Sequence, residues 1–265
     1  MPSVKTIKNT AGKILNAELF SHISAMLLIA VCVMSLLTTG EILTTLFGDL
    51  FGYTAYALAS FFLYAFTAAM IIPLIYGYAV FETNCVKNKK ADFTDMFCAF
   101  SELSMYVRSF KVFYALLWRF AIVFTIPAEL IRKFISYTNG NNYSKVIISG
   151  YDFGYTAIAV LIIASVIIAL VIYSKFFLSL YITVVRPEKS VSECFYSARI
   201  YRKNCSASQF SLAISFIPLM ILGILSMGIA FIYVIPLMLT SFFVFAHKRY
   251  ENTELNEAVT NMIFN

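Results

Sequence analysis

Apolar residues occur along this chain in long uninterrupted runs, separated by short segments in which charged residues gather. The longest run extends from Phe210 to Ala246 and contains no Lys, Arg, Asp, Glu or His. As a single helix it would measure about 55 Å, whereas the hydrocarbon core of a bilayer is about 30 Å thick. The run therefore predicts two spans. We place their reversal at Ser226-Met227-Gly228, because glycine takes the left-handed conformation that ends a helix.

Each of the other apolar runs predicts one further membrane-spanning helix. The expected fold is all-α: a polytopic membrane helix bundle that forms a single membrane domain over residues 1–265. The six predicted spans cover residues 19–39, 54–81, 112–131, 155–185, 207–225 and 229–246. The fourth is longer than one crossing requires, which predicts a tilted or protruding helix.

Three further segments are amphipathic rather than apolar throughout. Residues 1–17 place lysines between apolar residues at near-helical spacing, which predicts a helix lying on the membrane surface. Residues 93–110 and 190–204 each follow a span and a basic turn. We expect both to be cytoplasmic interfacial helices, with Thr94 and Ser192 as their capping residues.

The two interfacial segments also suggest an internal repeat. Lys90–Phe97 and Glu188–Phe195 align at a constant offset of 98 residues. Each unit has a span, a basic turn, a capped acid, a Phe two residues after that acid, and an amphipathic helix. This order predicts a parallel repeat about an axis along the membrane normal. The alternative is an accidental match between two capping sequences.

Charge and composition fix the class of protein and its expected orientation. The chain is 60% hydrophobic and only 13% charged, with a mean hydropathy of +0.81, which excludes an ordinary water-soluble domain. In the six-span topology three of the 20 Lys and Arg lie outside, at Arg132, Lys133 and Lys145, and two lie within spans. The other 15 face the cytoplasm, which predicts a multi-pass protein of the cell membrane with both termini cytoplasmic. The net charge of +6 then faces anionic lipid, and no nucleic acid partner is expected.

The sequence also contains a set of short motifs at Phe93–Phe100, Ile126-Pro127, Pro187-Glu188, Ser192-Glu193, Phe210–Ile217, Gly228-Ile229 and Pro236. Taken together, they resemble a family of bacterial integral membrane proteins of unknown function. That family is distantly similar to the membrane domain attached to some glycerophosphodiester phosphodiesterases. The resemblance covers residues 10–250 and implies a fold and a location, but no activity. The chain departs from the pattern at Ile126-Pro127-Ala128, where Pro-Gly is expected.

The sequence contains no recognisable catalytic or metal-binding motif. Nucleophile elbows, phosphate-binding loops and dinucleotide fingerprints are all missing from it. Its two histidines lie far apart: we expect His22 to make an interfacial hydrogen bond and His247 to belong to a basic flank. The five cysteines lack metal-ligand spacing and predict reduced thiols. We therefore expect no enzyme activity, no metal and no cofactor.

Arg119 and Lys175 are the two cations predicted within spans, and they are the candidate binding residues for an anion or a lipid headgroup. A charge near the bilayer centre costs at least about 2.5 kcal/mol. Both positions lie in the inner half of their spans, so one interpretation is that they extend toward the headgroups. The other is that they approach one another and hold an anionic headgroup or solute. The acid predicted within a span, Glu129, lies about 15 Å from Arg119 along the same helix.

Two functions fit these features. The first is a non-enzymatic membrane protein whose partners are the lipid bilayer, anionic lipid or a membrane protein of unknown identity. The second is a transporter or permease component for an anionic or amphiphilic solute, favoured by the charges within spans and by the repeat.

Overall fold

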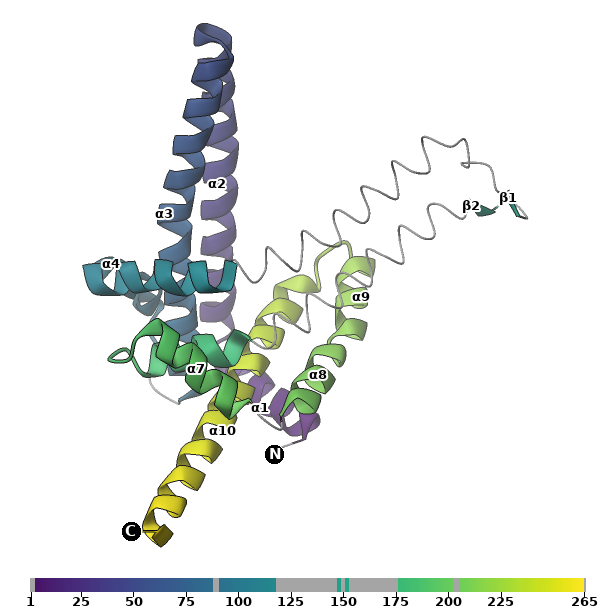
Figure 1. The fold of residues 1–265 in the computed structure, drawn as a ribbon. Helices are drawn as coiled ribbons and strands as arrows, with labels where there is room; N and C mark the ends of the chain where they lie inside the picture. Colours follow the sequence, from purple (N-terminus) through teal and green to yellow (C-terminus); the bar gives the residue numbers. More distant parts are fainter. Residues whose placement is uncertain are drawn as a thin grey trace.

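The computed structural model describes residues 3–87, 91–117, 147–148, 151–152, 176–202 and 205–264. These residues are almost entirely helical (Figure 1). Within them, four helices are long and apolar enough to cross a membrane: Leu19–Phe51, Tyr53–Val86, Ala207–Leu225 and Phe231–Leu255. The helical, membrane-type architecture is therefore confirmed for this part of the chain, where the exceptions are two short antiparallel strands, β1 (Ile147–Ile148) and β2 (Tyr151–Asp152). The predicted spans 112–131 and 155–185 fall largely outside the described residues, so the count of six stays a prediction.

Helices α2 (Leu19–Phe51) and α3 (Tyr53–Val86) form a long antiparallel hairpin (Figure 1). They reverse at Gly52, whose φ of 85° requires glycine. Each helix is about 50 Å long, so α2 continues well past residue 39, where we expected the first span to end. Gly40 lets α2 pack closely on α3, because an added Cβ there would lie 2.1 Å from the side chain of Leu63. Small residues permit this close helix contact without breaking the helix.

The reversal predicted at Ser226-Met227-Gly228 is confirmed. It joins α9 (Ile217–Leu225) to α10 (Phe231–Phe264), and Met227 and Gly228 have φ values of 53° and 93°. The amide of Gly228 donates a hydrogen bond of 2.9 Å to the carbonyl of Gly223, which closes the last turn of α9. The helix before α9, α8 (Ser206–Ile214), is separated from it by a short turn.

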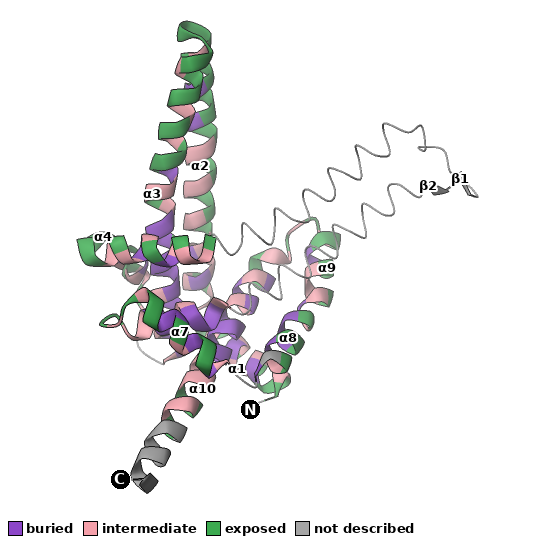
Figure 2. Ribbon diagram, viewed as in Figure 1, coloured by how far each residue is buried: buried purple, intermediate pink, exposed green. Residues whose placement is uncertain are grey.

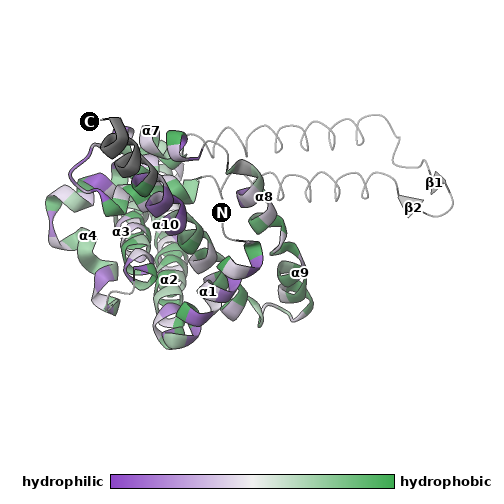
Figure 3. Cartoon of the chain, turned by 90° about the horizontal axis from the view of Figure 1, so that it is seen from below, coloured by the Kyte–Doolittle hydropathy of each residue, from purple (hydrophilic) through white to green (hydrophobic). Residues whose placement is uncertain are grey.

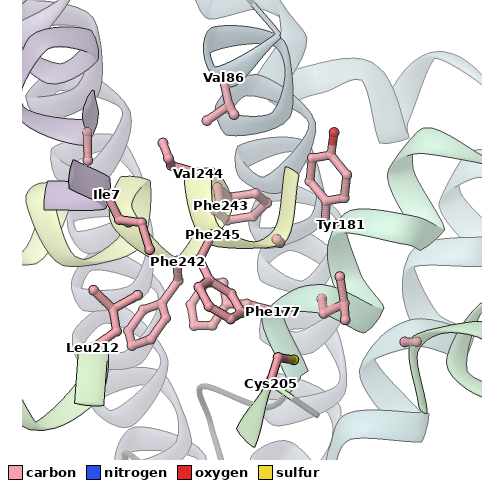
Figure 4. Close-up of a cluster of buried hydrophobic side chains, with 14 of the residues drawn as sticks. Ile7, Val86, Phe177, Tyr181, Cys205, Leu212, Phe242, Phe243, Val244 and Phe245 are labelled. Atoms are coloured by element: carbon pink, nitrogen blue, oxygen red, sulfur yellow. The ribbon is translucent and has the colours of Figure 1, made fainter. Parts of the chain in front are cut away.

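The middle of α10 is the centre of the bundle. Every residue from Thr240 to Ala246 is buried, which means that other elements surround the helix on all sides here (Figure 2). Phe177 stacks on Phe242 with ring centroids 4.9 Å apart and meets the edge of Phe243 at 5.5 Å. Figure 4 shows this cluster, to which the helix Phe176–Val185, α1 and α8 all contribute.

Helix α1 (Val4–Ala17) is amphipathic, as predicted, but its apolar face contacts protein. Ile7, Ala11 and Leu15 are at most 1% exposed, and the first two belong to the cluster around α10. Lys8 donates to the carbonyl of Ser215 at the end of α8 and lies over the ring of Phe216. The expectation of a helix lying on the membrane surface by this face is therefore wrong, because α8 and α10 cover that face.

Helix α10 continues beyond the predicted end of the sixth span at residue 246. A polar cluster holds this extension: Arg186 donates to Tyr250 at 2.9 Å and forms an ion pair with Glu254. Tyr201 also donates to Glu254, at 3.2 Å. Figure 3, which views the molecule from below, shows hydrophilic residues on α10 and α1. The tail of the chain is thus a helix tied to its neighbours by charge and hydrogen bonds.

The first interfacial segment differs from the single helix expected over residues 93–110. A short 3₁₀ helix, η1 (Phe93–Phe97), leads into α4 (Cys98–Ser101), and the chain breaks at Glu102, which has extended dihedral angles. A new helix then covers residues 103–117 and enters the region predicted as the third span. The second interfacial segment is one helix, α7 (Val191–Tyr201), as predicted.

The capping residues of both segments lie two positions before those we predicted. Asp92 accepts a hydrogen bond from the amide of Thr94, and Asp95 completes a capping box. Ser190 accepts from the amide of Glu193. The offset between Asp92 and Ser190 is again 98 residues, although the first segment breaks at Glu102 and α7 is continuous. A repeat of the whole units stays a prediction.

Gly77 allows η1 to pack closely on α3, and we expect Gly77→Ala to destabilise the protein. An added Cβ would lie 1.9 Å from the backbone carbonyl oxygen of Met96, which cannot move without shifting η1. Overpacking of this kind costs about 1 to 3 kcal/mol, so the melting temperature in detergent should fall. The matched control is Gly12→Ala on α1, where an added Cβ meets nothing within 4 Å. If both variants have the same melting temperature, the close approach of η1 to α3 does not require glycine at position 77.

The topology can be tested by labelling with a membrane-impermeant thiol reagent. The native Cys85 and Cys194 are 5% and 0% exposed and are unsuitable reporters. The exposed Asp49, near the end of the α2–α3 hairpin, and the exposed Glu188, before α7, are suitable positions for introduced cysteines. We expect Asp49→Cys to be labelled in intact cells and Glu188→Cys only after permeabilisation. The reverse pattern would show that the predicted orientation is inverted.

Candidate functional site

A cavity of about 830 Å³ lies between the helix of residues 103–117 and α7. Its walls carry three cations, Arg108, Lys111 and Arg199, and one carboxylate, Glu102. Three positive charges and one negative charge leave a net charge of +2. The cavity is therefore an electropositive hollow between the two segments that the sequence predicts at the membrane interface, and it favours anions.

Arg108 has a structural role in this cavity. Its Nη1 donates to the carbonyls of Pro187 and Lys189 at 2.9 and 2.8 Å, and its Nη2 donates to those of Thr183 and Arg186, each at 3.0 Å. These carbonyls belong to the end of the helix Phe176–Val185 and the turn that follows it. The last carbonyls of a helix have no hydrogen-bond partner within the helix. A planar guanidinium can donate to several of them at once, and its positive charge complements the negative end of the helix dipole.

Lys111 and Arg199 are the cations left available to a ligand. Both are exposed, and neither forms an ion pair or hydrogen bond with the part of the chain that the structure describes. Ser190, Val191 and Ser192, at the start of α7, line the same cavity. The first amides of a helix have no partner within the helix and point toward its N-terminal side. Available cations and the first residues of α7 thus line one hollow, which is a favourable arrangement for a phosphate or carboxylate group.

The cysteines near the interface are not suited to thiolate chemistry. Burial raises the pKa of Cys194, and the Arg108 guanidinium, 3.7 Å away, lowers it only in part. Burial, followed by the Asp95 carboxylate, raises the pKa of Cys98 to about 11. Both thiols therefore stay protonated at neutral pH, whereas a cysteine nucleophile needs a lowered pKa. Cys194 serves as a buried packing group beside Arg108.

A second polar centre lies where α2, α3 and α10 meet. His22 and Glu82 have side chains that are 0% exposed, with His22 Nδ1 2.9 Å from Glu82 Oε1. The hydroxyls of Tyr78 and Thr240 also donate to this oxygen, at 2.6 and 3.4 Å. Phe81 covers the imidazole, with ring centroids 5.1 Å apart. Three side chains, one from each of these helices, thus converge on one carboxyl oxygen of Glu82.

Sequence reasoning missed this second centre. We expected the second span to end at residue 81, which put Glu82 in the cytoplasmic flank, but α3 continues to Val86. His22 does make a hydrogen bond, but it does so in full burial instead of at the interface. The sequence feature that could have indicated this centre is the four-residue spacing of Tyr78 and Glu82, which puts both side chains on one face of a helix. His247 likewise has specific partners, Tyr181 and Glu251.

The candidate residues Arg119 and Lys175 lie outside the described part of the chain. Whether they approach one another stays a prediction. Comparison with protein-family models, curated proteins and solved structures found no match to this chain. The resemblance to bacterial membrane proteins likewise stays an expectation, and the function must be argued from the geometry of the sites.

We expect Arg108→Lys to destabilise the protein although it keeps the positive charge. A lysine ammonium is a point donor and cannot reach four carbonyls as the guanidinium does. Loss of two or more hydrogen bonds to a charged group should cost about 2 kcal/mol or more, measurable as a lower melting temperature in detergent. The control is Arg199→Lys in the same cavity, where no described hydrogen bond is lost. Equal melting of the two variants would contradict the structural role of Arg108.

Proposed function

We propose that this chain is a non-enzymatic integral protein of the cell membrane that binds an anionic lipid headgroup at the cavity between residues 103–117 and α7. The observation that carries the proposal is the convergence of Lys111, Arg199 and the first turn of α7 on a hollow of net charge +2. A lipid phosphate presents negative oxygens that match both kinds of donor.

Apolar side chains around the cavity favour a lipid over a free anion. Leu103 and Val107 on one helix are 78% and 42% exposed, and Tyr196 and Ile200 on α7 are 67% and 49% exposed. In water these side chains would be costly to expose, whereas at the membrane interface they contact acyl chains and lipid glycerol. A headgroup in the cavity would therefore leave its acyl chains next to an apolar rim.

Transport of an anionic or amphiphilic solute is the second candidate function. It is favoured by the buried pair of His22 and Glu82, because ionisable residues inside membrane bundles commonly mark ion and solute pathways. Solute-dependent flux in proteoliposomes would favour transport. Retention of anionic lipid without flux would favour the lipid-binding function.

The headgroup site is tested by replacing its two available cations together, as Lys111→Gln with Arg199→Gln. Each cation near an anionic lipid contributes about 1 kcal/mol, so affinity for phosphatidylglycerol should fall about 30-fold. Native mass spectrometry of lipid retained after mild detergent extraction measures this loss directly. Thermal stabilisation by added phosphatidylglycerol gives a second measurement on the same samples.

The matched control replaces two exposed cations of α1, as Lys5→Gln with Lys13→Gln. It makes the same change in net charge but leaves the cavity intact, so lipid retention should stay at the wild-type level. Inorganic phosphate serves as the probe for a soluble anion. Equal lipid loss in both double variants would contradict a specific site, and stabilisation by phosphate alone would point to a soluble ligand.

A further inference from the structure

The buried centre of His22 and Glu82 leaves two polar atoms without partners. Glu82 Oε1 receives His22, Tyr78 and Thr240, whereas Glu82 Oε2 and His22 Nε2 are buried and make no hydrogen bond within the described part of the chain. Buried polar atoms in native proteins are almost always paired, because an unpaired one costs about 1 to 3 kcal/mol. An unpaired imidazole nitrogen in a dry membrane bundle therefore needs an explanation.

The charge of this centre depends on a single proton. Hydrogen bonds from several donors to one carboxyl oxygen favour the ionised form of the carboxyl group. With a neutral His22 the pair carries a net charge of −1 at a site that is 0% exposed, and with His22 protonated the net charge is zero. A lone charge buried in a medium of low polarity is strongly disfavoured, so binding of one proton removes the penalty.

We propose that His22 and Glu82 form a proton-binding site, in which the proton binds to and leaves from His22 Nε2. The Nδ1–H stays directed at Glu82 Oε1 in both states. On protonation an O–H bond of a hydronium ion breaks, its proton bonds to Nε2, and a neutral water molecule leaves. The imidazole becomes an imidazolium paired with the carboxylate. The ligand of this site is a proton, so it differs from the anionic headgroup of the interfacial cavity.

The surroundings of the pair are suited to this role. Among the described residues, the other titratable groups near it are Tyr78 and Cys85 on α3 and Glu18 at the start of α2, and α10 contributes the neutral hydroxyl of Thr240. Glu18 lies one helical turn before His22 at the half-exposed start of α2, where it accepts a hydrogen bond from the Cys85 thiol. Cys85 is close enough to both Glu18 and Glu82 to be affected by their charges. Carboxyl and imidazole groups inside membrane bundles are the residue types that form proton relays.

The chain contains only two histidines, so nitrogen NMR of the full-length protein labelled with ¹⁵N-histidine tests the proposal directly. In His247→Gln, the single remaining imidazole reports on His22. In lipid nanodiscs between about pH 5 and pH 9, where histidines titrate, its Nε2 resonance should move from the imidazolium to the neutral position as pH rises. The Nδ1 resonance should stay that of a protonated nitrogen throughout.

Two further substitutions in this background give opposite shifts of the titration midpoint. Glu82→Gln removes the negative partner of the imidazolium, so its Nε2 resonance should reach the neutral position at a lower pH than in the parent. Tyr78→Phe removes a donor that stabilises the carboxylate, so the pair should hold its proton to a higher pH. If Glu82→Gln does not fold, the direction of the Tyr78→Phe shift decides. A His22 resonance that is constant across this pH range, or a midpoint that neither substitution moves, overturns the proposal.

Discussion

The burial of α10 on all sides is the constraint on which the rest of the bundle depends. A helix surrounded over Thr240–Ala246 needs a partner for every face, and the chain supplies them from α1, α3, α8 and the helix Phe176–Val185. The aromatic pair of Phe177 and Phe242 is one such contact. Because lipid is as apolar as a core side chain, these contacts stabilise the bundle through packing density rather than through the hydrophobic effect.

The interfacial cavity follows from the way in which the chain completes hydrogen bonding at one helix end. The carbonyls after the helix Phe176–Val185 need donors, and Arg108 reaches them from residues 103–117. That contact holds the helix of residues 103–117 next to α7 and leaves a hollow between them. The other two cations that line the hollow, Lys111 and Arg199, form no ion pair or hydrogen bond with the described part of the chain. The structural role of Arg108 and the binding role that we propose for Lys111 and Arg199 thus belong to different basic residues of one cavity.

The two polar centres use opposite physical environments. The cavity with Lys111 and Arg199 is open and exposed, so its charges are hydrated and attract ligands that approach from the membrane surface. The pair of His22 and Glu82 is dry, so a change of one proton has a large electrostatic effect there. Helix α10 touches the buried pair through Thr240 and extends to the polar cluster of Tyr250 and Glu254.

Much of the fold was predictable because membrane helices obey strict rules of length and polarity. The run from Phe210 to Ala246 required a reversal, and of its two glycines, Gly223 and Gly228, the second lies at the turn that the structure has. The caps were missed by two residues, since Asp92 and Thr94 are both capable capping residues and only the path of the chain selects one. The break at Glu102 was not predictable either, because the apolar pattern continues through it.

The sequence by itself determined a membrane helix bundle and the hairpin before α10, because backbone hydrogen bonds must be satisfied within each span. Only the tertiary structure decided the candidate sites. Glu82 and His22 are 60 residues apart, and Arg108 lies 75 or more residues before the carbonyls it binds. Such pairings depend on which helix faces pack against each other. The periodicity of the sequence shows which face of a helix is apolar, but it does not show which other helix packs on that face.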